Sequence, residues 1–263
     1  MKRSKIKTKY LDIINENYKK NYTLKIENTI KEKKDISSQI KAALTSFGLI
    51  FLLTFYIYIP LIPLALLGIN YDNFSYTEKL IYATICGILF LIFLIYIYRK
   101  ELSQNFKDFF NKNIKENLRI PIKYWLMGLG IMILSNLIIS IITNGGVANN
   151  EESVRQLIDK FPLYMVFQII IYAPITEELI FRKSFKEIFN NAYLDIIPSG
   201  LVFGGLHVIT SITTITDLLY IVPYSALGIA FAYTYNKTNN IFSTISMHAL
   251  HNFLTLILYL VIS

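Results

Sequence analysis

The sequence predicts an all-α polytopic membrane protein, and three observations support this fold class. The chain has 263 residues, 54% of them hydrophobic, with a mean hydropathy of +0.44, which is too apolar for an ordinary soluble domain. Long uncharged runs recur along it, and about 20 apolar residues span a bilayer as a helix. The runs are continuous rather than alternating, and a helix satisfies its own backbone groups inside lipid. We therefore predict seven spanning helices.

Seven uncharged runs define these helices. They cover residues 42–71, 80–98, 124–150, 161–176, 196–216, 218–236 and 238–263. Pro60 and Pro63 are expected to bend or end the first helix, because proline breaks the helical hydrogen-bond ladder. Cys86 is the only cysteine, which excludes an internal disulfide, and it is most simply a small packing residue.

Basic residues are distributed unevenly between the loops. Residues 1–41 hold 12 Lys/Arg, residues 99–123 hold 7, residues 182–195 hold 3, and Lys237 adds one. In a seven-helix topology these 23 of the 26 basic residues share one side of the membrane. The positive-inside rule then predicts a plasma-membrane protein with a cytosolic N-terminus. Topology and anionic lipid account for the net charge of +8, so no nucleic-acid partner is predicted.

The chain divides into three predicted parts. Residues 1–41 form a basic cytosolic tail, residues 42–150 hold the N-terminal transmembrane helices with a basic loop, and residues 151–263 form a core that carries every motif. A Gly/Asn-rich break at 144–150 precedes the core. The basic loop has apolar residues at helical spacing: Phe106, Phe109, Phe110 and Ile114. This spacing is typical of an amphipathic helix at the membrane interface, which would bring the count to eight helices.

Two adjacent glutamates, Glu177 and Glu178, end an uncharged stretch of 16 residues. That stretch is about 24 Å of helix, which leaves the pair inside a hydrocarbon layer of about 30 Å. A charge there costs about 2.5–3.5 kcal/mol on insertion scales, so both are candidates for function. Glu178 can pair with Arg182 at i+4, whereas Glu177 faces another surface. A helix end held by a salt bridge is the simpler alternative for this motif alone.

Two further motifs contain histidines inside apolar runs. Phe203 and His207 share a helix face, and Gly204-Gly205 between them allow close approach of a backbone or substrate. A lone buried histidine is more often structural, so this motif is weak by itself.

His248 and Asn252 are likewise stacked at i and i+4, and His251 is expected to be structural. The three motifs lie within about 10 Å of one another in depth. Ionisable groups inside a membrane normally face a bundle interior or a watery cavity. Together the motifs predict one polar cavity between the C-terminal helices.

In this order, the motifs Glu-Glu-x-x-x-Arg, Phe-x-x-x-His and His-x-x-x-Asn resemble those of the CAAX protease and bacteriocin-processing family. This is the family of the type II CAAX prenyl endopeptidase and of bacterial Abi membrane proteins. The resemblance covers residues 161–263, about two fifths of the chain. It implies an intramembrane endopeptidase whose substrates are membrane-associated peptides or proteins, with membrane lipids as surroundings. Peptide or bacteriocin processing, or self-immunity, are family-level implications.

The resemblance also assigns roles to single residues. Glu177 is implied as the catalytic glutamate and His207 as its partner on an activated water. His248 and Asn252 are implied to stabilise the oxyanion. The implied supporting residues are Glu178, Arg182 and Phe203. Physical chemistry agrees, since a desolvated glutamate is suited to act as a general base and amide or imidazole groups donate to an oxyanion.

The need for a metal stays open at the level of the sequence. Glu177, His207 and His248 are the candidate ligands of a His₂Glu zinc site with an open position for water. The chain lacks the His-Glu-x-x-His motif that places two zinc ligands on one helical turn. We therefore favour a metal-free glutamate mechanism with no cofactor.

Two functions without proteolysis are alternatives. A non-catalytic membrane scaffold or immunity factor would bind a partner in the same cavity. A proton-coupled transporter would use the buried glutamate and histidines as a relay, but the sequence shows no convincing duplicated half of the kind common in transporters.

Overall fold

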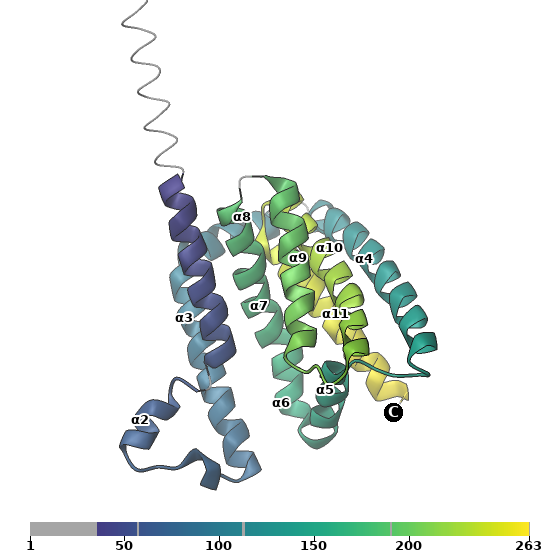
Figure 1. Cartoon of the computed structure of the whole chain (residues 1–263). Coiled ribbons are helices and arrows are strands. Elements are labelled where there is room, and N and C mark those ends of the chain that lie inside the picture. Colours follow the sequence, from purple (N-terminus) through teal and green to yellow (C-terminus); the bar gives the residue numbers. More distant parts are fainter. Residues whose placement is uncertain (1–35, 57, 112–113, 190, 263) are drawn as a thin grey trace, which may run out of the picture.

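The computed structural model describes residues 36–56, 58–111, 114–189 and 191–262, and the regular structure within them is helical. Seven helices of this part of the chain are long and apolar enough to cross a membrane, which confirms the predicted fold class (Figure 1). Most of the predicted tail 1–41 lies outside the described residues. Its last part, from residue 36, already belongs to the first long helix.

The N-terminal half supplies three of the seven long helices. Its elements are the helix Ile36–Phe55, α2 (Leu61–Leu66), the 3₁₀ turn η1 (Tyr71–Asn73), α3 (Tyr76–Asn111) and α4 (Ile114–Ile142). The first helix ends before Pro60, as the proline spacing predicts, and Pro60 then caps the short α2. Cys86 is buried in α3.

The C-terminal half supplies the other four. Pro162–Ile188 is one long helix composed of α6 (Pro162–Phe167), η2 (Gln168–Tyr172), α7 (Ala173–Glu177), η3 (Glu178–Lys183) and α8 (Ser184–Ile188). It is preceded by α5 (Asn149–Lys160) and followed by α9 (Ala192–Ile209), the 3₁₀ helix η4 (Ile215–Tyr220), α10 (Ile221–Thr238) and α11 (Ile241–Ile262). The helices alternate in direction, so α8 marks one end of the bundle and α5 the other (Figure 1).

The interfacial helix predicted around residues 106–114 is not a separate element. Phe106, Phe109 and Phe110 lie on the last turns of α3, which continues without a break because no proline or glycine interrupts residues 88–111. Phe106 and Phe109 pack against Phe242 of α11, with ring centroids 5.6 and 6.5 Å apart. Of these residues Phe109 is buried in the helix packing, whereas Phe106, Phe110 and Ile114 remain exposed.

A helix that the apolar runs do not predict, α5, crosses one end of the bundle (Figure 1). It begins at Asn149, within the Gly/Asn-rich break 144–150, in which Asn144 and Gly145 both have positive φ. It is polar along most of its length, with an ion pair between Glu151 and Arg155, so it has no uncharged run. Its buried Ile158 packs in a cluster with residues of α6 and α11.

The long helix Pro162–Ile188 widens into π-helical turns at η2 and η3. Pro174 explains the first of them, because it has no N–H to donate to the carbonyl of Ile170 and its ring crowds that carbonyl. Such π turns occur mostly as single turns inside α-helices and frequently at functional sites. Here η2 and η3 flank α7, the turn that ends at Glu177.

Helices α9, α10 and α4 pack closely because glycines line their contacts. A Cβ atom built on Gly204 would lie 2.6 Å from the backbone nitrogen of Ser225, and one on Gly128 would lie 2.8 Å from Cβ of Ala230. Small residues at helix crossings let the backbones approach closely in membrane proteins. Helix α10 therefore lies between α9 and α4 and holds the C-terminal helices in place.

Candidate active site

The two glutamates of the first motif have different surroundings. Glu178 and Arg182 are fully buried, and the Arg182 Nε and Nη2 donate to the Glu178 carboxylate at 2.9 and 3.3 Å. This is the i, i+4 pair that the spacing predicts. Glu177 faces another surface, and its side chain keeps 18% of its exposure.

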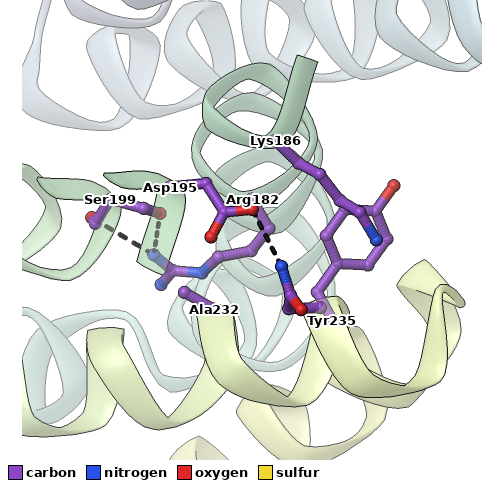
Figure 2. A pocket seen from close by; sticks show the side chains of 7 residues that line it. Arg182, Lys186, Asp195, Ser199, Ala232 and Tyr235 are labelled. Atoms are coloured by element: carbon purple, nitrogen blue, oxygen red, sulfur yellow. Dashed lines mark hydrogen bonds between the residues drawn. The ribbon is translucent and has the colours of Figure 1, made fainter. Parts of the chain in front are cut away.

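Arg182 is held from α9 as well. Its Nη1 donates to Ser199 Oγ at 2.9 Å and to the Ser199 carbonyl oxygen at 3.3 Å (Figure 2). Its guanidinium lies 4.7 Å from the ring centroid of Phe203, within the range of a cation–π contact. Sequence reasoning missed Ser199, although it lies four residues before Phe203 and therefore on the same face of the helix.

The Glu177 carboxylate lies opposite both motif histidines. Its Oε2 is 4.0 Å from His207 Nε2 and 3.9 Å from His248 Nε2. That oxygen is buried and accepts no hydrogen bond from the residues that the structure describes. The structure thus brings together three residues that the sequence places on separate helices, α7, α9 and α11.

The second ring nitrogen of each histidine has a fixed partner. His207 Nδ1 lies 2.8 Å from the carbonyl oxygen of Phe203, and His248 Nδ1 lies 3.0 Å from Glu178 Oε1. Both partners are acceptors, so each Nδ1 carries the proton and a neutral ring presents the Nε2 lone pair. Three acceptor atoms therefore converge at Glu177, which suits a molecule that donates in more than one direction.

Aromatic rings orient the two imidazoles. His248 stacks on Phe231 with ring centroids 5.1 Å apart and meets the edge of Phe203. His207 lies against Phe203 at 4.4 Å and Tyr224 at 4.9 Å. Phe231 and Tyr224 come from α10, and no local spacing links them to the histidine motifs.

Asn252 contacts the backbone of the long helix in this structure. Its Nδ2 donates to the carbonyl oxygen of Ile169 at 2.8 Å, inside the π-helical η2. One amide hydrogen of Asn252 is therefore engaged, and the second remains for another acceptor. His251, expected to be structural, accepts from the indole N–H of Trp125 at 3.4 Å.

The spacing of Glu177, His207 and His248 does not fit a shared zinc ion as it stands. Zinc holds nitrogen and oxygen ligands at about 2.0–2.2 Å, so neighbouring ligand atoms of a tetrahedral site lie about 3.3 Å apart. The carboxylate oxygen is 3.9–4.0 Å from both imidazole nitrogens. Within the described ranges, no three His, Cys, Asp or Glu side chains are arranged to hold a metal.

Comparison with known proteins identifies similarity over the same part of the chain. Residues 159–254 match the family model of the Rce1-like type II CAAX prenyl endopeptidase. The C-terminal part of the chain is similar to this family. The matched region includes all seven residues that the motifs single out, and the similarity supports a membrane-embedded hydrolase of peptide bonds. The described part of the chain has seven helices long and apolar enough to cross a membrane, and the protein is an integral membrane protein.

Alignments with individual curated relatives cover more of the chain than the family match does. The membrane-embedded CAAX protease MroQ of Staphylococcus aureus (strain USA300) is 28% identical over 221 residues, covering 76% of this chain and 85% of MroQ. The putative membrane peptidase YdiL of Bacillus subtilis (strain 168) is 29% identical over 119 residues, 44% of this chain and 45% of YdiL. The UPF0177 protein YbdI of Lactococcus lactis subsp. lactis (strain IL1403) is 28% identical over 184 residues, which cover 66% of this chain and 95% of YbdI. No solved structure matches significantly.

Proposed function

We propose that this protein is an intramembrane endopeptidase in which Glu177 activates a water molecule. The observation that carries the proposal is the buried Glu177 Oε2, which faces the Nε2 atoms of His207 and His248 at 4.0 and 3.9 Å. A water that forms hydrogen bonds of about 2.8 Å fits between atoms at this spacing. It would donate one hydrogen to Glu177 Oε2 and the other to the Nε2 atom of His207 or His248.

The proposed reaction needs only the groups already present. Glu177 accepts a proton from the water while the water oxygen attacks the carbonyl carbon of the peptide bond. The new C–O bond forms a tetrahedral oxyanion, and collapse breaks the C–N bond while the proton passes from Glu177 to the leaving amine. Asn252 is the proposed oxyanion donor, through the amide hydrogen that Ile169 does not use. His248 would donate as well only as an imidazolium, after Nε2 has taken up a proton from solvent.

The proposed mechanism uses no metal. We expect purified active protein to contain zinc far below one atom per chain, and we expect chelators to leave cleavage unchanged. Metal content by mass spectrometry, measured on the same preparation as the activity, tests both points. Stoichiometric zinc together with a chelation loss that zinc reverses would replace this mechanism with a metal-dependent one.

The proposed substrates are membrane-associated peptides or the membrane-proximal ends of proteins, reached in the plasma membrane with the N-terminus of this chain in the cytosol. Uneven loop charge supports that orientation. Precursors of secreted peptides and bacteriocins, and peptides against which a cell protects itself, are the substrate classes that we propose to test first.

Terminal-peptide proteomics tests the function directly. Membranes and medium from cells lacking the gene are compared after complementation with wild type, Glu177→Gln or the matched control Glu152→Gln, whose carboxylate is exposed on α5. New peptide ends should appear with wild type and Glu152→Gln and be absent with Glu177→Gln. If the same new peptide ends appeared with wild type and with both variants, Glu177 would not be part of the mechanism. A phenotype rescued by a Glu177→Ala, His207→Ala double variant would instead support a scaffold.

A further inference from the structure

A small polar cavity lies beside Arg182 of the buried ion pair, and Figure 2 shows the side chains that line it. Its polar lining comes from three helices and consists of Arg182, Lys186, Asp195, Ser199, Tyr235 and Asn236. The space open to the centres of water molecules is about 10 Å³. A cavity of about that size holds one water.

Asp195 supplies the feature that calls for an occupant. The residue is 5% exposed, in the first turn of α9, and its Oδ2 accepts from Asn236 Nδ2 at 2.9 Å. Its Oδ1 is also buried and accepts no hydrogen bond from any residue that the structure describes. A buried carboxylate oxygen is rarely left without a donor, because its lost hydration is then uncompensated.

Arg182 supplies a donor on the same cavity. A guanidinium has five N–H groups, and the structure gives Arg182 four hydrogen bonds, two to Glu178 and two to Ser199. One of these bonds uses Nη2, which has two hydrogens. At least one N–H of Arg182 therefore remains for an acceptor.

The charges around the cavity decide which occupant fits. The positive Arg182 and Lys186 disfavour a cation, and the Asp195 carboxylate disfavours an anion. The occupant must donate to Asp195 Oδ1, accept from a guanidinium and have the size of one water. A single water molecule meets all three requirements.

We propose that one internal water bridges Asp195 Oδ1 and Arg182, and that Asp195 thereby positions the Glu178–Arg182 pair, which in turn binds His248 Nδ1. The role of Asp195 in catalysis, but not the water bridge itself, rests on the proposed function. Arg182 is then held on one side by Glu178 and on the other by Ser199 and the bridged Asp195. Rotation of the guanidinium would disturb Glu178 Oε1, the atom that fixes His248 Nδ1.

An experimental structure of the wild-type protein that resolves waters tests the bridge without reference to activity. We expect one ordered water within hydrogen-bond distance of Asp195 Oδ1 and a nitrogen of Arg182. In Ala232→Val, the added methyl groups should displace this water from the cavity that Ala232 lines. A direct ion pair from Asp195 to Arg182 or Lys186, with no water between, would overturn the proposal.

Cleavage rates test the positioning role. Asp195→Asn and Ala232→Val should each lower the yield of new peptide ends by about tenfold per folded molecule, since small displacements in an active site have large effects on rate. The control Asp72→Asn removes an exposed carboxylate outside the long helices and should cleave like wild type. Wild-type rates in both cavity variants, at equal folded amounts, would refute positioning. Were the wild type to cleave nothing, the proposed function would fail, and the wild-type and Ala232→Val structures alone would decide the bridge.

Discussion

Neighbouring residues can have opposite roles on one helix, and Glu177 and Glu178 show this. Glu178 is fully buried and is bound by Arg182 and His248, whereas Glu177 is partly exposed and faces two imidazole nitrogens without a hydrogen bond from the described residues. Consecutive helical residues point about 100° apart, so the pair divides between two surfaces. The structural carboxylate is Glu178, and the carboxylate that we propose for the chemistry is Glu177.

This difference predicts that the same substitution, glutamate to glutamine, destabilises the protein at one position and not at the other. Glu178→Gln should destabilise the protein by about 3–5 kcal/mol, because it leaves the buried Arg182 without its counter-charge. Glu177→Gln removes no hydrogen bond to the protein and should leave unfolding close to that of wild type. Thermal unfolding of both variants in one detergent measures the contrast. Equal destabilisation would show that Glu177 also has a structural role.

Tyr224 is expected to orient His207 through its ring rather than its hydroxyl. The two rings stack at 4.9 Å, whereas the hydroxyl accepts only a long hydrogen bond of 3.4 Å from Asn150. An aromatic pair is worth about 0.5–1.5 kcal/mol, so losing it should slow cleavage by up to about tenfold. Tyr224→Leu should therefore be slow and Tyr224→Phe close to wild type. If both variants were equally slow, the hydroxyl would be the important group.

The sequence predicted the motif residues of the site better than the residues of other helices that contact them. Spacing of four residues places Glu178 with Arg182 and Phe203 with His207, and the structure has both arrangements. Ser199, Tyr224 and Phe231 were missed because their contacts cross between helices. Helix crossings depend on which faces meet, and this information is absent from the period of a single helix.

At the scale of the element, the long helix Pro162–Ile188 was predicted as an apolar run but not as a widened one. A run of apolar residues looks the same whether the turns are α or π. The one local signal was Pro174, whose missing N–H frees the carbonyl of Ile170. The neighbouring carbonyl of Ile169 accepts from Asn252, so the irregular turn also joins this helix to α11.

The two motif glycines of α9 should respond differently to alanine. A Cβ on Gly204 would come within 2.2–2.9 Å of Ser225 and the carbonyl of Ile221, whereas one on Gly205 would meet only Ile209 Cδ1 at 3.8 Å. Gly204→Ala should cost about 1–3 kcal/mol or more through overpacking. Gly205→Ala should be neutral or slightly stabilising, because alanine favours helix over glycine.

Unfolding temperature and the yield of monodisperse protein check this pair. Each glycine is the control for the other, since both substitutions add one methyl group at adjacent positions of α9. Similar losses in both variants would show that the contact between α9 and α10 is not the limiting feature.

At the scale of the whole molecule, the N-terminal helices support the C-terminal core. Asn105 of α3 accepts from the backbone N–H of Ile241 through its side chain and from Asn240 Nδ2 through its carbonyl, both at 2.8 Å. Trp125 of α4 donates to His251. The boundary predicted near residue 150 stays a prediction, but contacts of this kind cross it.

Residues 151–263 expressed alone are therefore expected to fail to fold. They would lose the cap on α11 and the close packing of α4 against α10. Coexpression with residues 1–150 should restore a complex that copurifies. Size-exclusion chromatography of both preparations tests this, and a monodisperse 151–263 fragment would establish an independent domain.

The fold as a whole was largely predictable because each spanning helix has its own uncharged run. The end of α3 and the whole of α5 could not be predicted in this way, because a charged loop and a polar helix have similar compositions. In α5 the buried Ile158 is one of few apolar residues among charges. Such a helix is recognisable once the ends of the other helices are placed.

The shortness of α9 has a consequence for the surrounding lipid. Its 18 residues span about 27 Å, whereas the 29 residues of α4 span about 44 Å. Ile197, Leu201 and Ile209 are exposed along it, and a bilayer of about 30 Å thins where it meets a shorter hydrophobic helix. His207 lies two residues from the end of α9, so we expect headgroups and water to approach the protein core beside this histidine. Such thinning would shorten the path of a polar peptide backbone through hydrocarbon, and we expect faster cleavage in short-chain than in long-chain lipids.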